Sequence, residues 1–162
     1  MSQYKWISDK TPDNYQVKQV YGIVFSKDGR VFLRIEDFKY QLTGGKPEES
    51  ETFEETLKRE YLEEVNVEIE DIHYLGYLLV DEENGIPPYA QVRMIGKIKR
   101  VGPLKPDTDN GKIYQRLLVS PSNVKNYLKY SGTAGNLMIE DALYLAREKY
   151  EFLDVEEKKE FV

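Results

Sequence analysis

Residues 42–67, LTGGKPEESETFEETLKREYLEEVNV, join a pair of glycines to a dense run of glutamates. Carboxylate oxygens are the ligands that hard cations such as Mg²⁺ and Mn²⁺ prefer in proteins. A cation held in this way can draw charge from a bound phosphate and activate a water molecule. The segment therefore raises two interpretations: a metal-dependent phosphate site, or an ordinary acidic helix that faces solvent.

A helix is predicted from about residue 51 to 65, and its glutamates do not all fall on the solvent side. At about 100° per residue, one apolar stripe contains Phe53, Leu57, Tyr61 and Val65. Glu60 and Glu64 fall on that same side, whereas Glu63 falls outside the stripe. A carboxylate that faces the protein without a partner loses favourable hydration. The pattern therefore indicates that something cationic compensates these acids.

The compensating charge has two candidate sources. Glu60 and Glu64 are spaced i and i+4, so they repel each other, and a divalent cation between them would turn this repulsion into coordination. The alternative is a charged helix with ion pairs to Lys58 and Arg59. Glu54 also falls within the arc of the stripe, where the helix dipole tolerates an acid, so helical angle alone does not identify a metal site.

The two ends of this helix carry their own signals. Gly44 and Gly45 predict a loop in which backbone comes close to a ligand, because glycine adopts φ values closed to other residues. The alternative is a glycine pair in a tight turn. At the other end, Asn66 is predicted to stop the helix in a left-handed conformation.

Composition limits the classes of partner. The chain has 162 residues, a formal net charge of -6 and no cysteine. An acidic protein has no basic field to gather a polyanion, so we expect no long nucleic acid as partner. No apolar run approaches the ~18 residues of a membrane span, and the absence of cysteine excludes disulfides and thiolate chemistry. We expect a cytoplasmic protein with no membrane partner.

The order of predicted elements is β-β-α-β-β-β-α-α, which indicates an α+β fold with helices covering a mixed sheet. Strands are predicted at 16–26, 30–36, 72–80, 89–101 and 112–120. The first two would form a hairpin. Helices are predicted within 120–130 and 136–150. We expect one domain over 1–162, with residues 1–15 and 152–162 peripheral or frayed.

The charged positions resemble the box of the Nudix hydrolase superfamily, whose pattern is G-x5-E-x7-R-E-U-x-E-E-x-G-U, where U is apolar. The matching residues are Gly45, Glu51, Arg59, Glu60, Tyr61, Glu63, Glu64, Asn66 and Val67. Two of them depart from the pattern: Tyr61 stands where a smaller aliphatic residue is usual, and Asn66 where glycine is usual. Neither departure changes a charge. The resemblance covers roughly residues 17 to 150 and implies a MutT-like α/β/α sandwich.

The resemblance also implies roles for individual residues. Glu60, Glu63 and Glu64 would ligate Mg²⁺ or Mn²⁺ together with the Gly44 carbonyl, and Glu60 is the leading candidate for the general base. Arg59 and Glu51 would orient these carboxylates, Glu48 would lie near the metals, and Lys46 and Gly45 would contact phosphate. Arg34, on the strand before the glycines, could reach a phosphate or base; the alternative is a surface cation.

The implied activity is hydrolysis of a diphosphate linkage in a nucleoside diphosphate derivative, such as a nucleoside triphosphate or nucleotide sugar. The alternative is a non-catalytic Nudix-like module that binds a nucleotide. Acids outside the box are further candidates for the general base, namely Asp107, Asp109, Glu82 and Glu83. We expect specificity to come mainly from loops 81–90 and 102–111. The resemblance is also compatible with a homodimer.

Overall fold

The computed structural model describes residues 1–128, 132–153 and 160–162. Its strands are β1 (Gln3–Ser8), β2 (Val17–Phe25), β3 (Val31–Glu36), β4 (Lys39–Gln41), β5 (Thr43–Gly45), β6 (Val67–Asp81), β7 (Tyr89–Val101), β8 (Gln115–Val119) and β9 (Glu160–Phe161). Its helices are α1 (Phe53–Val65), η1 (Pro121–Asn123), α2 (Val124–Tyr127) and α3 (Gly132–Lys149). The expected α+β fold is confirmed.

The strands form one sheet in the order β1-β6-β7-β2-β3-β8-β9, with β4 paired to β3 and β5 to β2. Strands β2 and β7 run parallel, and the other pairs are antiparallel, so the sheet is mixed as predicted. The predicted hairpin of β2 and β3 exists only at its turn, where Phe25 pairs with Val31. Beyond that point β3 turns away to pair with β8, and β2 pairs with β7 and β5.

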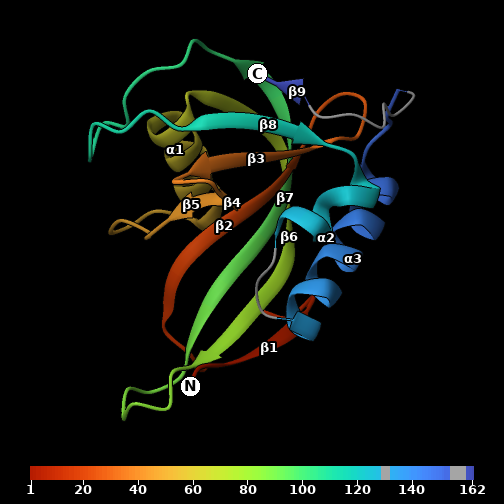
Figure 1. The fold of residues 1–162 in the computed structure, drawn as a ribbon. Helices are drawn as coiled ribbons and strands as arrows, with labels where there is room; N and C mark the ends of the chain where they lie inside the picture. Colours follow the sequence, from red (N-terminus) through yellow and green to blue (C-terminus); the bar gives the residue numbers. More distant parts are fainter. Residues whose placement is uncertain (129–131, 154–159) are drawn as a thin grey trace.

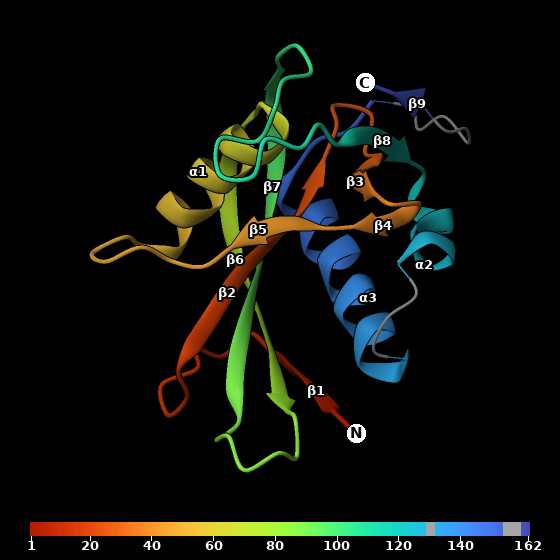
Figure 2. The same ribbon diagram turned by 60° about the vertical axis from the view of Figure 1, so that its left-hand side comes forward.

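Helices α1 and α3 cover opposite faces of the sheet (Figures 1 and 2). Strand β2 serves both faces because its side chains alternate. Val20 and Val24 belong to the core that contains Leu57 and Tyr61 of α1, and Ile23 belongs to the core under α3. Each fully buried apolar side chain of this size contributes about 1.5–3 kcal/mol. Two cores therefore hold the sheet between its helices.

Helix α1 begins and ends as its sequence predicts, to within two residues. The Thr52 side chain accepts a hydrogen bond from the Glu55 backbone N–H, and the Glu55 side chain accepts one from Thr52, which forms a capping box. Asn66 ends the helix at φ 53° and ψ 47°, the predicted left-handed conformation. The predicted apolar stripe is confirmed, because Leu57, Tyr61 and Val65 are buried.

The glycine pair differs from the prediction. Gly44 and Gly45 do not form a loop with left-handed φ; they lie in β5 and pair with Tyr21 and Val20 of β2. The reason for glycine is close packing. A Cβ atom on Gly44 would collide with the Val20 carbonyl, and one on Gly45 would lie 2.5 Å from the Glu60 carboxylate carbon.

The N-terminus also differs from the prediction. We expected residues 1–15 to be peripheral or frayed, yet Gln3–Ser8 pair with β6 along the whole of β1. The Trp6 indole N–H donates to Asp141 of α3 at 2.7 Å, so the strand is tied to the helix that covers it. Of the expected C-terminal tail, residues 154–159 lie outside the described part, and Glu160–Phe161 pair with β8.

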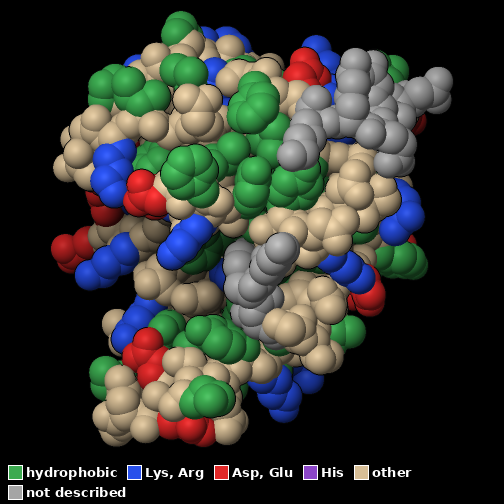
Figure 3. All heavy atoms as spheres, in the orientation of Figure 1, with side chains coloured by type: hydrophobic (Ala, Val, Ile, Leu, Met, Phe, Trp, Pro, Cys, Tyr) green, Lys and Arg blue, Asp and Glu red, His purple; other side chains and the backbone are tan. Residues whose placement is uncertain are grey.

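The remaining strands match in place but not always in length. β7 has the predicted bounds, β6 begins five residues before the predicted residue 72, and β8 is shorter than predicted. Hydrophobic side chains gather over β3 and β8 on the face seen in Figure 3. Within the described residues, no helix combines the length and apolar character needed to cross a membrane.

Candidate functional site

Arg59 is the centre of a network of carboxylates at the start and middle of α1. Its Nε donates to Glu51 at 2.6 Å, and its Nη1 donates to Glu60 at 2.9 Å and to Glu63 at 3.1 Å. Its Nη2 donates to the Lys46 carbonyl at 3.1 Å. The planar guanidinium suits this arrangement because its donors point in fixed directions. One cation thus donates to three of the predicted acids, and a fourth, Glu48, lies 3.7 Å from its Nη1.

Glu51 lies just before the helix and is held by more than Arg59. Its carboxylate also accepts from the Glu48 backbone N–H at 2.7 Å and from the Thr56 hydroxyl at 3.0 Å. Hydrogen bonding from Arg59 is the main reason why the pKa of Glu51 is lowered to about 2. Glu51 is therefore an anion that fixes Arg59.

Glu60 is buried against the glycine strand, with only 7% of the residue exposed. Its carboxylate lies over Gly45, where a side chain would displace it. Burial raises the pKa of Glu60 even though Arg59 favours the charged form. The absence of a side chain at Gly45 is thus what lets this carboxylate approach the sheet.

Glu64 has the least compensated carboxylate of the site. Its side chain is 15% exposed, and its nearest cation is Arg34, whose Nε lies 3.4 Å away. Within the described residues, its Oε2 atom is buried without a hydrogen-bond partner. Burial is the main reason why the pKa of Glu64 is raised to about 8; the charges of Glu60 and Asp107 contribute to this rise, and Arg34 opposes it.

Arg34 lies between the carboxylates and loop 102–111. Its guanidinium lies 3.3 Å from Glu36 and stacks at 4.5 Å over the ring of Tyr114. Asp107 belongs to the same loop and is 5% exposed. The other predicted specificity loop is at the opposite end of the long strands β6 and β7 (Figure 2). Only one of the two loops therefore borders the carboxylates.

The structure brings together Glu51, Arg59, Glu60 and Glu63 through one guanidinium, and Glu64 with Arg34. Lys46 contacts this network only through its backbone carbonyl, which accepts from Arg59, and its side chain is exposed. Glu54, which the helical angle left open, is exposed and lies 3.4 Å from Lys58. Of the two sources of compensation considered from the sequence, the ion pairs to Lys58 and Arg59 are present.

Among the four loop acids, Asp107 is buried and its charge acts on Glu64, whereas Asp109 is exposed and its backbone N–H donates to the Asp107 carboxylate at 2.8 Å. Glu82 instead accepts from Tyr89 and Glu83 from Gln3, near the N-terminal strand. Sequence reasoning missed Tyr21 and Arg93. They are paired across the parallel strands β2 and β7, and a pattern within either strand does not predict this register.

The carboxylates fit a hard cation by their chemistry. Among the described residues, no three His, Cys, Asp or Glu side chains are arranged as a ready metal site, and Glu60 and Glu63 accept hydrogen bonds from Arg59. Glu64 nevertheless keeps a buried oxygen that lacks a hydrogen-bond donor within the described part of the chain. Oxygen donors suit Mg²⁺ or Mn²⁺, so the donor set is compatible with either ion.

The sequence and the fold are both similar to those of known proteins. The sequence model of the NUDIX domain matches residues 16–79. The Bacillus subtilis pyrophosphohydrolase RppH is 20% identical, with a TM-score of 0.67 over 85% of this chain and 88% of that one. A NUDIX hydrolase from Nitrosomonas europaea is 19% identical, with a TM-score of 0.61 over 87% and 97% of the two chains.

The MutT protein of Bacillus halodurans is likewise similar, at 19% identity and a TM-score of 0.58, covering 78% of this chain and 82% of that one. No curated protein matches the sequence. At these identities the likeness between structures shows a common fold.

Proposed function

The chain is a member of the Nudix hydrolase superfamily with a MutT-like fold, and we propose that it hydrolyses a diphosphate linkage with Mg²⁺ or Mn²⁺ as cofactor. The substrate class is a nucleoside diphosphate derivative, either a nucleoside triphosphate or a nucleotide sugar. The observation that carries the proposal is Glu64, an acid 15% exposed whose carboxylate is 3.4 Å from its nearest cation. Such a group is costly unless a cation joins it.

In the proposed complex, Glu60, Glu63, Glu64 and the Gly44 carbonyl hold the cation. A cation bound there supplies positive charge to the bridging phosphate oxygens and lowers the pKa of the attacking water. Glu63 and Glu60 are already directed by Arg59, at 3.1 and 2.9 Å. Glu51 keeps Arg59 in place through its 2.6 Å contact. Arg59 and Glu51 therefore position the carboxylates of Glu60 and Glu63.

Proton transfer and substrate binding fall to neighbouring residues of the chain. Glu60 is proposed to accept the proton of the attacking water, because burial raises its pKa toward the range of a general base. Asp107 is the alternative base. Arg34 would contact a phosphate oxygen from the opposite side of Glu64, and Lys46 and Gly45 would do so from the glycine strand.

The test is a hydrolysis screen with Mg²⁺ across nucleoside triphosphates and nucleotide sugars, with Glu64→Gln as the matched variant. Gln keeps the shape of the side chain and removes its charge. We expect a loss of at least ~10² in kcat, as when a group that stabilises transition-state charge is removed. Turnover that survives in Glu64→Gln would remove Glu64 from the mechanism.

The non-catalytic alternative predicts a different result in the same screen. A nucleotide would then raise the unfolding temperature of the wild-type protein without release of phosphate or nucleoside monophosphate. Release of either product by the wild type, but not by Glu64→Gln, would exclude this alternative.

A further inference from the structure

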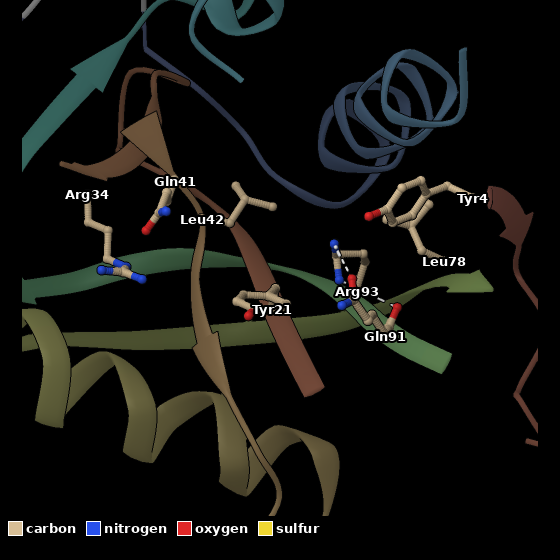
Figure 4. A pocket seen from close by; sticks show the side chains of 8 residues that line it. All are labelled: Tyr4, Tyr21, Arg34, Gln41, Leu42, Leu78, Gln91 and Arg93. Carbon is tan, nitrogen blue, oxygen red and sulfur yellow. Dashed lines mark hydrogen bonds between the residues drawn. The ribbon is translucent and has the colours of Figure 1, made fainter. Parts of the chain in front are cut away.

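A cavity of about 270 Å³ adjoins the carboxylate site and shares Arg34 with it. Figure 4 shows Arg34 and Arg93 on either side of Tyr21. The Arg34 side of the cavity lies against Glu64, at 3.4 Å. The far side is formed by Gln91 and Arg93 of β7 and by Tyr4 of β1. A diphosphate held at Glu64 would therefore direct one of its substituents into this cavity.

The charge of the cavity is opposite to that of the protein. The chain carries a formal net charge of -6, yet the described residues that line the cavity include two arginines and no acid. Arg93 is 3% exposed and its guanidinium lies 4.8 Å from the centre of the Tyr21 ring. A guanidinium that stacks on an aromatic ring keeps its N–H donors in a fixed plane, which suits phosphate oxygens.

Amide groups complete the polar part of the cavity. Arg93 Nη2 donates to the Gln91 side-chain oxygen at 3.3 Å, which fixes the direction of the guanidinium. On the other side, the Gln41 side-chain oxygen is buried without a hydrogen-bond partner in the described part of the chain. An oxygen of this kind can accept a hydrogen bond from a hydroxyl group. The cavity thus offers an acceptor and cationic donors to the same ligand.

The size of the cavity favours a compact group. A volume of about 270 Å³ is at the lower limit of the roughly 300–1,000 Å³ that small-molecule pockets occupy. A sugar phosphate matches both the size and the chemistry: its hydroxyls can donate to Gln41, and its phosphate can accept from Arg93. An uncharged nucleobase has no anionic oxygen to accept from the guanidinium of Arg93.

We propose that this cavity selects substrates in which one substituent of the diphosphate is a phosphorylated ribose, with Arg93 as the specificity-determining residue. This inference rests on the proposed hydrolase function and names its substrate more narrowly. It also assigns a role to β1, because Tyr4 closes the far side of the cavity.

The test compares substrates that differ by one phosphate on a ribose. NADPH and NADH form one such pair, and coenzyme A and 3′-dephospho-coenzyme A form the other. For the wild type with Mg²⁺, we expect kcat/KM to be at least about tenfold higher for the phosphorylated member of at least one pair, mainly through KM. Equal turnover of both members in both pairs would overturn the proposal.

Two variants of the cavity sharpen this comparison. Arg93→Met removes the charge and keeps the length of the side chain. Gln91→Glu is isosteric and places a carboxylate at the contact with Arg93, where it competes with a ligand phosphate. Both should reduce the preference to about twofold or less. A preference that persists in either folded variant contradicts the role of Arg93, and Gln91→Glu decides the matter if Arg93→Met does not fold.

Arg100→Met is the matched control, since Arg100 lies on the same strand but contacts Glu68 outside the cavity. It should keep the wild-type preference. A loss of preference in this control would attribute the effect to general charge and overturn the proposal.

A binding experiment separates failure of this proposal from failure of the hydrolase assignment. If no pair is hydrolysed, calorimetric titration with ribose 5-phosphate and with ribose tests the cavity alone. Binding of the phosphorylated sugar only, present in wild type and Glu64→Gln but lost in Arg93→Met, would support the cavity without the activity. Absence of binding in the wild type would overturn it.

Discussion

The carboxylates of α1 fall into two parts that the protein treats differently. Glu51, Glu60 and Glu63 share the guanidinium of Arg59, at distances of 2.6 to 3.1 Å. Glu64 is one residue further along, its side chain is 15% exposed, and Arg34 at 3.4 Å is its nearest cation among the described residues. The carboxylates of the first part accept hydrogen bonds from the chain itself, whereas Glu64 has a buried oxygen without a hydrogen-bond donor in the described residues, and burial disfavours its charged form.

This difference separates orientation from catalysis. Acids that Arg59 already holds can be aimed before any ligand arrives, because their positions are fixed by hydrogen bonds. The Glu64 carboxylate gains most from a cation, because it starts with the fewest compensating contacts. We therefore expect the two parts to respond in opposite ways to loss of charge in the absence of metal.

The largest contrast is expected from Glu64→Gln. Besides its loss of at least ~10² in kcat, this change removes a carboxyl whose charged form burial disfavours. Above pH 8, where that charged form predominates in the metal-free protein, Glu64→Gln should therefore be more stable than the wild type by about 1 kcal/mol. Thermal denaturation in EDTA and in Mg²⁺ measures both effects. The wild type should gain stability from Mg²⁺, and Glu64→Gln should gain much less.

The matched control is Glu54→Gln, which alters an exposed acid on the same helix that pairs with Lys58. Its stability should change by less than about 0.5 kcal/mol, as for other surface ion pairs. If Glu64→Gln behaves like this control in EDTA, Arg34 compensates Glu64 adequately, which would contradict the proposed difference between Glu64 and the acids that Arg59 binds.

Arg59→Met tests the other part of the site and should have the opposite sign in EDTA. Without the guanidinium, Glu51, Glu60 and Glu63 repel one another and Glu60 stays buried without its partner, so the protein should lose stability. Mg²⁺ should restore part of this loss. We expect kcat/KM to fall about tenfold, because the ligands remain but are no longer oriented. Unchanged stability in EDTA would show that Arg59 does not hold the cluster.

Much of this arrangement follows from local sequence. The left-handed Asn66 and the inward placement of Glu60 and Glu64 depend on residues within one helix, so periodicity and end signals predict them. The strand β7 is also predicted from local sequence, because strand-forming residues follow one another along it between two loops. Local patterns thus account for the elements and for the acids on α1.

The pairing of strands that are distant in the sequence is not predicted by local patterns. The first residues look polar and terminal, yet β1 is an edge strand because β6 extends far enough to pair with it. The glycines look like a flexible turn, but they are required because Gly44 meets β2 and Gly45 meets Glu60. Arg93 enters the site through a parallel register with Tyr21. These features depend on contacts between segments that are distant in the sequence, and hydrophobic periodicity within one segment does not predict such contacts.

Gly45→Ala tests the approach of Glu60 to the sheet. Its Cβ would lie 2.5 Å from the Glu60 carboxylate carbon, so the end of the Glu60 side chain must move while the backbone can stay. We expect kcat to fall several-fold with little change in stability. Gly96→Ala on β7 is the control, because its Cβ would have ordinary contacts at 3.5 Å or more. Equal activity in the two variants would contradict the contact.

The smallest effect is expected at Asn66, where the helix end meets the loop that carries Asp107. The Asn66 side-chain Nδ2 donates to the Pro103 carbonyl at 2.9 Å, and its carbonyl accepts from Gly102 N–H at 2.9 Å. Asn66→Gly keeps the left-handed backbone and removes only the first of these contacts, worth about 1 kcal/mol. Hydrogen exchange should therefore rise in loop 102–111 and remain unchanged in α1.

The consequence reaches Glu64 because Asp107 is one of the charges that raise its pKa. A looser loop admits water to Glu64 and makes it more like the exposed acids of the helix, so kcat should fall about twofold. Asn66→Ala adds the strain of φ 53° on a residue with a Cβ, and should lower stability further without a further loss of activity. If the loop exchanges equally in wild type and Asn66→Gly, the side chain of Asn66 does not anchor it, and the burial of Glu64 must come from Arg34 and the sheet alone.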